Sequence, residues 1–122
     1  MTRQTLPNRR HCVTGSTIWR GQQIEVSVGF DPETGEAREA FADIALGGQI
    51  QHELSDACVL ASIALQCGVS IEALQKTMGS ESISIDGRSY VEPTSPVGAA
   101  LAAVRFIADG VKNDPAFCQG GA

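Results

Sequence analysis

The stretch QIQHELSDACVLASIALQCGVSIEALQKTM, Gln49–Met78, decides how the rest of the chain is arranged. Its central part, Ala57–Leu65, reads ACVLASIAL and contains Ser62 as its only polar side chain. Apolar side chains therefore point in every direction around a 3.6-residue period, which is typical of a buried helix. We expect a central helix that two layers of structure cover.

The same stretch contains the signals that end this helix and begin another. Gly68 suits the position after a helix C-terminus, where a left-handed backbone conformation is common. Ser70 suits the N-cap of a second, shorter helix over Ile71–Met78. The stretch thus predicts a long buried helix, a tight corner and a short helix.

The residues before this stretch predict a three-stranded antiparallel meander. His11–Trp19 is rich in β-formers, and Ile24–Phe30 alternates apolar with polar or small residues. Arg20-Gly21 is the expected turn between these two strands. Ala40–Leu46 offers a third strand, and the apolar face of the meander needs the helices as its cover.

The residues after Met78 predict a weaker hairpin and a third helix. Ser80–Glu92 has short arms around an Asp86-Gly87 turn, so its place in the fold is left open. Ser95-Pro96 is a strong helix start, and we expect that helix to fray near Gly110. The fold class is therefore α+β: a three-stranded meander packed against a buried helix, a short second helix and a C-terminal helix.

Length and charge set limits on the class of protein. The 122 residues suit a single domain, 1–122, with a flexible arm over 1–8 and a flexible tail over 113–122. No apolar run approaches the roughly 18 residues of a membrane span, and the N-terminus lacks the apolar centre of a signal peptide, so we expect a cytoplasmic protein. The net charge of −5 argues against a general nucleic-acid binder. Arg9 and Arg10 nevertheless form a local basic pair that suits a phosphate or an acidic partner surface.

Residues with catalytic or metal-binding chemistry do not form a familiar pattern. The four cysteines include no CxxC pair, and no Walker loop or GxGxxG motif is present. Cys58 and Cys67 are nine residues apart, on opposite sides of a helix, and are expected to be small buried hydrophobic residues. A zinc site made from His11, Cys12 and His52 is disfavoured, because the short ligand spacings of zinc sites are missing. We therefore assign no catalytic, cofactor-binding or metal residue.

Two polar pairs remain to be placed. Glu39 and Asp43 are four residues apart on the third strand, so they share a side, most simply a solvent face. Ser62 and Gln66 are four apart on the central helix and are expected to bond the backbone or each other.

Several short motifs, taken in order, resemble a known family. They are LPNRR at Leu6–Arg10, the Val28-Gly29 pair, a strand reaching Phe41 and Asp43, and SIALQ at 62–66 followed by Gly68-Val69. Together they resemble the TSCPD domain, which is found near the C-terminus of adenosylcobalamin-dependent (class II) ribonucleotide reductases. The resemblance covers about residues 6–78, and the order and spacing of the motifs are more specific than any one of them.

This resemblance implies an accessory or regulatory domain in DNA precursor synthesis, related to ribonucleoside-diphosphate reductase. In those reductases the catalytic barrel, the radical cysteine and the cobalamin site lie in other parts of a much longer chain. The resemblance therefore implies no catalysis by this domain alone, no cofactor of its own, and a reductase catalytic subunit as partner. The segment Phe117–Ala122 resembles a shortened redox tail, but Cys118 is its only cysteine, so we expect an exposed thiol.

A second class of function stays open beside the first. The apolar central helix also suits a self-associating module, a homodimer in which the central or the third helix packs against its mate. Such a module descended from the reductase domain could bind nucleic acid or nucleotides, although the acidic composition counts against this. Close helix contacts are expected at two sets of small residues: Ala57, Ala61 and Ala64, and Ala99, Ala100 and Ala103.

Overall fold

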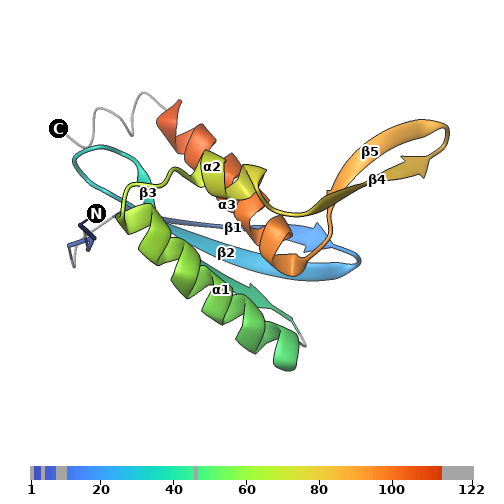
Figure 1. Cartoon of the computed structure of the whole chain (residues 1–122), viewed down its shortest axis with the longest axis horizontal. Coiled ribbons are helices and arrows are strands. Elements are labelled where there is room, and N and C mark those ends of the chain that lie inside the picture. Colours follow the sequence, from blue (N-terminus) through green and yellow to red (C-terminus); the bar gives the residue numbers. More distant parts are fainter. Residues whose placement is uncertain (1, 4, 8–10, 46, 114–122) are drawn as a thin grey trace.

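The computed structural model describes residues 2–3, 5–7, 11–45 and 47–113. Three strands come first, then two helices, a two-stranded hairpin and a final helix (Figure 1). The bounds are β1 His11–Trp19, β2 Gln22–Phe30, β3 Ala37–Ile44, α1 Gln49–Gln66, α2 Ile71–Lys76, β4 Ser80–Ile85, β5 Arg88–Pro93 and α3 Pro96–Lys112.

β1, β2 and β3 form one antiparallel sheet in sequence order, which confirms the meander. The turn between β1 and β2 is the expected Arg20-Gly21, with φ angles of 49° and 79°. Two positive φ angles in a two-residue turn match the twist of the strands that it joins.

β3 begins and ends earlier than the alternation of side chains predicted, at Ala37–Ile44 instead of Ala40–Leu46. The loop before it closes on itself, because the amide of Asp31 donates to the carbonyl of Glu36 at 2.9 Å. Ala37 is thereby placed opposite Phe30, so pairing starts as soon as the loop ends.

The sheet has one covered face and one open face. Ile24 lies opposite Ile44, and Val26 lies opposite Ala42, so the buried side chains of β2 and β3 share a face. Helices α1 and α3 both pack against it. The opposite face is mostly polar, as at Glu25, with Phe41 as an exposed apolar side chain. This two-layer arrangement confirms the α+β prediction.

The core between these layers is built from aliphatic residues, alanines, one phenylalanine and Cys58. Its largest fully buried side chains are Phe30, Ile24, Leu54, Leu65, Val26, Val28 and Val104.

Helix α1 is buried on one side only, so the prediction of a helix covered by two layers was wrong. Val59 is 52% exposed and Leu60 is 69% exposed on its outer side. The reason is that α1 lies at the end of the helical layer, over β3, where none of the described elements covers its outer side. It ends before Gly68, whose φ of 101° confirms the predicted stop.

The two later helices start at the predicted caps. The hydroxyl of Ser70 accepts from the amide of Ala73, and that of Ser95 accepts from the amide of Gly98, each at 3.1 Å. α2 ends at Lys76, two residues early. α3 does not fray near Gly110 but continues to Lys112, because Val111 packs against the core.

The weaker hairpin is also confirmed, and its place in the fold is now defined. β4 and β5 pair around Asp86 and Gly87, whose φ angles are 52° and 78°. Figure 1 shows this hairpin projecting beyond the sheet, so we call Ser80–Pro93 the arm. None of the described helices is both long and apolar enough to cross a membrane.

Candidate interaction site

The two outer edges of the sheet differ in how their backbone groups are satisfied. At the β3 edge, side chains of α1 take the place of a neighbouring strand. The Ser62 hydroxyl accepts from the Ala40 amide at 3.0 Å and donates to the Ala40 carbonyl at 3.1 Å. The Gln51 carbonyl oxygen accepts from the Ile44 amide at 2.6 Å, and its NH₂ group donates to the Ala42 carbonyl at 3.3 Å. The β3 edge is therefore capped.

Of the pair Ser62 and Gln66, the serine bonds the backbone as expected, although on β3 and not on its own helix. Gln66 accepts a hydrogen bond from the Arg3 guanidinium, which fixes the described part of the N-terminal segment beside the end of α1. The two side chains thus anchor different segments to one helix.

The β1 edge is open. Trp19 and Gln22 flank the two-residue turn and exchange hydrogen bonds, so every second residue of β1 faces β2 with its backbone. The backbone groups of the residues between point away from the sheet: Cys12, Thr14, Ser16 and Ile18. No hydrogen bond to these four residues occurs within the described ranges. The Ile18 side chain is 74% exposed.

A cleft with a volume of about 710 Å³ opens beside this edge, between β1, the arm and α3. Its lining is largely apolar. Ile18 contributes from β1, Ile83 and Tyr90 from the arm, and Ala103 and Phe106 from α3. Phe106 is 81% exposed, the highest fraction among the large apolar side chains that the structure describes. An apolar cleft beside an unpaired strand is typical of a protein–protein contact.

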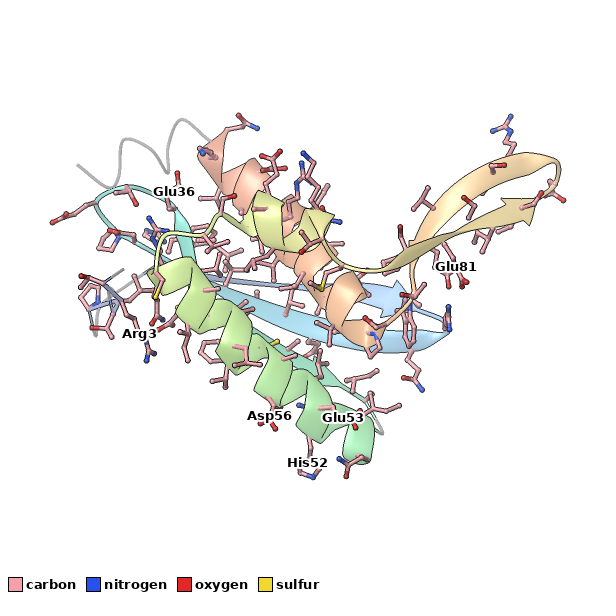
Figure 2. All side chains as sticks on the ribbon, in the orientation of Figure 1. Arg3, Glu36, His52, Glu53, Asp56 and Glu81 are labelled. Carbon is pink, nitrogen blue, oxygen red and sulfur yellow. The ribbon has the colours of Figure 1, made fainter. Side chains whose placement is uncertain are left out.

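The arm is held at its base by contacts to the end of β1. Arg20 contacts Glu81 at 2.7 Å and Glu92 at 2.8 Å, and it lies over the Trp19 ring at 4.7 Å. Figure 2 shows Glu81 at the base of the arm. The hydrogen bond to Glu92 raises the pKa of Arg20 above its usual value. The Trp19 indole also donates to the carbonyl of Pro93 at 2.8 Å. These contacts set the position of one wall of the cleft.

The residues singled out from the sequence are mostly outside this cleft. Arg9, Arg10 and Cys118 lie outside the described residues. Figure 2 shows His52 on the outer side of α1, pointing away from the sheet that carries His11 and Cys12. The disfavoured zinc grouping is therefore not assembled, and the described residues contain no group of three metal-ligating side chains.

The remaining predicted positions are partly confirmed. Glu39 and Asp43 do share the open face of β3, where Asp43 accepts from the Gln51 side chain at 3.1 Å. Cys58 is buried, and burial raises the pKa of its thiol to about 11. Cys67 is only half-buried, so its predicted burial was wrong: it follows the last turn of α1, outside the core.

The two alanine sets predicted for helix pairing are partly used inside the chain. Ala61 of α1 and Ala99 and Ala100 of α3 are buried in this chain itself. Because they pack inside this chain, they offer little outer contact surface. Ala99 and Ala103 of the α3 set both line the cleft.

Comparison with known proteins assigns the family. The model of the TSCPD domain matches residues 2–106. The chain belongs to the TSCPD domain family. The match extends past residue 78, so the arm and most of α3 belong to the TSCPD domain as well. This domain is found in ribonucleotide reductases. No curated protein and no solved structure matches the chain.

The cleft of this TSCPD domain was missed in the sequence, although two signals for it were present. Cys12–Trp19 contains no charged residue and no proline, which is unusual for the edge of a sheet. Ile83, Ile85 and Tyr90 share one side of a hairpin whose other side is rich in serine. Neither signal shows which elements meet, because the arm and β1 are some 60 residues apart in sequence.

Proposed function

We propose that this TSCPD domain is an accessory or regulatory domain that acts with a ribonucleotide reductase catalytic subunit in DNA precursor synthesis. The observation that carries the proposal is the family match over residues 2–106. In this proposal the domain contributes contacts and no chemistry of its own. The buried Cys58 fits that role, because a thiol with a raised pKa is a poor nucleophile near neutral pH.

The proposed contact with the reductase is the basic pair Arg9 and Arg10. The chain carries a net charge of −5, yet these two arginines are adjacent in sequence, which concentrates positive charge at one point. Guanidinium groups bind carboxylates and phosphates in a bidentate manner. A contact of this kind weakens as salt screens it.

The experiment uses an adenosylcobalamin-dependent catalytic chain from which its own TSCPD domain has been removed. Adding the present chain should produce a complex in a sedimentation or calorimetry assay and should change the rate of ribonucleotide reduction. Arg9→Ala with Arg10→Ala should weaken binding by about tenfold at low salt and by less at high salt. Lys76→Ala with Arg88→Ala removes the same charge elsewhere and should leave binding unchanged.

Two results would count against the proposal. One is the absence of both binding and a rate change at concentrations up to about 100 µM, which corresponds to a very weak contact. The other is ribonucleotide reduction by this chain alone, with adenosylcobalamin and a thiol reductant.

A second candidate function, self-association, is favoured by a separate observation: the open β1 edge beside an apolar cleft. Binding of nucleic acid through the open face of the sheet is less favoured. Glu25 and Asp43 lie on that face, and their charge would repel a phosphate backbone.

A further inference from the structure

We infer that the β1 edge is the surface on which a second copy of this chain binds. In this arrangement β1 of one copy pairs with β1 of the other in antiparallel fashion, and the two three-stranded sheets become one of six strands. The two α3 helices then lie side by side above the junction. The inference does not depend on the reductase proposal.

The first support is that, within the described residues, the β1 edge is long and regular and carries neither lysine nor proline. It is nine residues long, and its register with β2 runs from His11 to Trp19 without a shift. Across the described strands of this sheet, the register shifts only between β2 and β3, at Gly29 and Phe30. Edge strands that stay unpaired are normally short, bulged, or interrupted by lysine or proline. At the β3 edge of the same sheet, by contrast, side chains of α1 bond the backbone groups.

The second support identifies the occupant as another copy of the chain. An antiparallel pair that overlaps over all nine residues has its twofold axis at Gly15. Thr14 of each copy then lies opposite Ser16 of the other, and Cys12 lies opposite Ile18. All these side chains are uncharged, so a copy of the strand meets no repulsion from like charges. The edge is therefore complementary to itself.

The third support is the position of α3 above the axis. A side chain at Gly15 would meet Ile107 of α3, whose Cδ1 atom is 2.9 Å from the place of a Cβ atom. A second copy paired at β1 places its own α3 over the same face of the joined sheet, on the other side of the twofold axis. Phe106 of each copy then has an apolar neighbour to pack against, since the cleft of the other copy lies opposite it.

The arm supplies the outer wall of this contact. Ile83 and Tyr90 are opposite each other on one side of the hairpin, together with Ile85. An isolated two-stranded hairpin is marginally stable in water. Contact of this apolar side with a second α3 would stabilise the arm as well as the pair.

The size of the surface is adequate for a stable dimer. A strand of nine residues is about 30 Å long, and a sheet with its covering helix is about 20 Å deep. The strip beside the β1 edge therefore measures on the order of 600 Å² on each copy, before the arm is counted, which is the lower end of the roughly 600–1,000 Å² per partner that stable interfaces bury.

The first experiment measures association of the full chain by analytical ultracentrifugation between about 1 and 100 µM, the range in which a dimer with an interface of this size forms. The wild type should be dimeric at the upper end. Ser16→Lys blocks the edge, and Phe106→Glu places a charge in the cleft. Each should raise the dissociation constant at least about tenfold. Both side chains are exposed, so circular dichroism should show an unchanged fold. Leu60→Glu is the matched control on the outer side of α1 and should not change the constant.

The second experiment tests the register. Cys12 and Ile18 would be opposite each other across the axis, about 5.5 Å apart at Cα, which a disulfide can bridge. Ile18→Cys should therefore give covalent dimers under mild oxidation. The double variant Ile18→Cys with Cys12→Ser is the control and should not form them at the same rate.

Three results would overturn the inference. The first is a wild type that is still monomeric at about 100 µM. The second is a dimer that Leu60→Glu dissociates while Ser16→Lys and Phe106→Glu do not. The third is equal crosslinking of Ile18→Cys with and without Cys12. Binding to a reductase, or its absence, leaves each of these results unchanged.

Discussion

Ser62 shows how a single polar side chain determines where a helix lies. It is buried in an otherwise apolar run, and it bonds both backbone groups of Ala40 on β3. Gln51, three turns earlier on α1, does the same for Ile44 and Ala42. The two residues therefore hold the helix in register with the strand, a task that apolar contacts perform less specifically because they have no direction.

Replacing Ser62 by Ala should lower the free energy of unfolding by about 1–3 kcal/mol, because the buried amide and carbonyl of Ala40 lose their partner. Urea denaturation measures this change. Ser82→Ala, on an exposed position of the arm, is the control and should change the stability by less than about 0.5 kcal/mol. Equal values for the two variants would show that Ser62 has no anchoring role.

Cys58 should make the stability sensitive to alkaline pH. Its pKa in the folded chain is about 11, against 9.0 for an unburied thiol. Between these values the unfolded chain loses the proton and the folded chain keeps it, so the free energy of unfolding falls as the pH rises. Below pH 8 both states hold the proton, and this residue adds no pH dependence.

The measurement compares wild type with Cys58→Ala by denaturation at pH 8 and pH 11. The stability advantage of the wild type should shrink by on the order of 2 kcal/mol over this range. Cys12→Ala, which removes an exposed thiol, is the control for alkaline effects of other residues. An advantage that stays constant with pH would contradict the assignment.

At the scale of elements, the arm is the segment that depends most on a few contacts. Its base is held by Arg20 and by the Trp19 indole, whereas its tip at Asp86-Gly87 has no other element beside it (Figure 1). Segments with few buried contacts open locally at low free energy. Among the β-strands, those of the arm should therefore be the first to exchange their amide hydrogens with solvent.

Arg20→Ala should increase amide hydrogen exchange in residues 80–93 several-fold, because both ion pairs at the base of the arm are lost. Global stability should stay close to that of the wild type, since exposed ion pairs contribute little. Mass spectrometry of exchanged peptides gives the first value and urea denaturation the second. Arg88→Ala at the tip is the matched control, and an equal rise in that variant would argue against bracing by Arg20.

Most elements could be predicted from the sequence because their signals are local. The turns at Arg20-Gly21 and Asp86-Gly87 and the caps at Ser70 and Ser95 depend on residues within a few positions of each other. The burial of α1 could not be predicted in this way. Whether Leu60 is covered depends on which side of β3 the helix reaches, and on what the distant α3 leaves uncovered.

At the scale of the whole molecule, the open edge links folding to concentration. If two copies pair through β1, unfolding must also separate them, so the melting temperature should rise with protein concentration. Differential scanning calorimetry over a hundredfold range should detect the rise. Ser16→Lys should remove it and Leu60→Glu should retain it. A wild-type melting temperature that is independent of protein concentration would contradict a coupling between unfolding and dissociation of the two copies.

The candidate site could be predicted less well than the fold. The family resemblance is present in the sequence and is confirmed. Its motifs lie in residues 6–78, however, and include neither the arm nor Phe106. The cleft arises only when β1, the arm and α3 are brought together. No local pattern indicates that meeting, because it depends on the packing of the entire chain.

The capped β3 edge has one more consequence. A sheet with two free edges can add copies without limit, as filaments do. Here the side chains of Gln51 and Ser62 close one edge, so the three-stranded sheet of each copy has a single edge left for strand pairing. Once two copies have paired their β1 edges with each other, neither of these sheets can accept a third. The same helix that covers the core would thus make the assembly terminate at two.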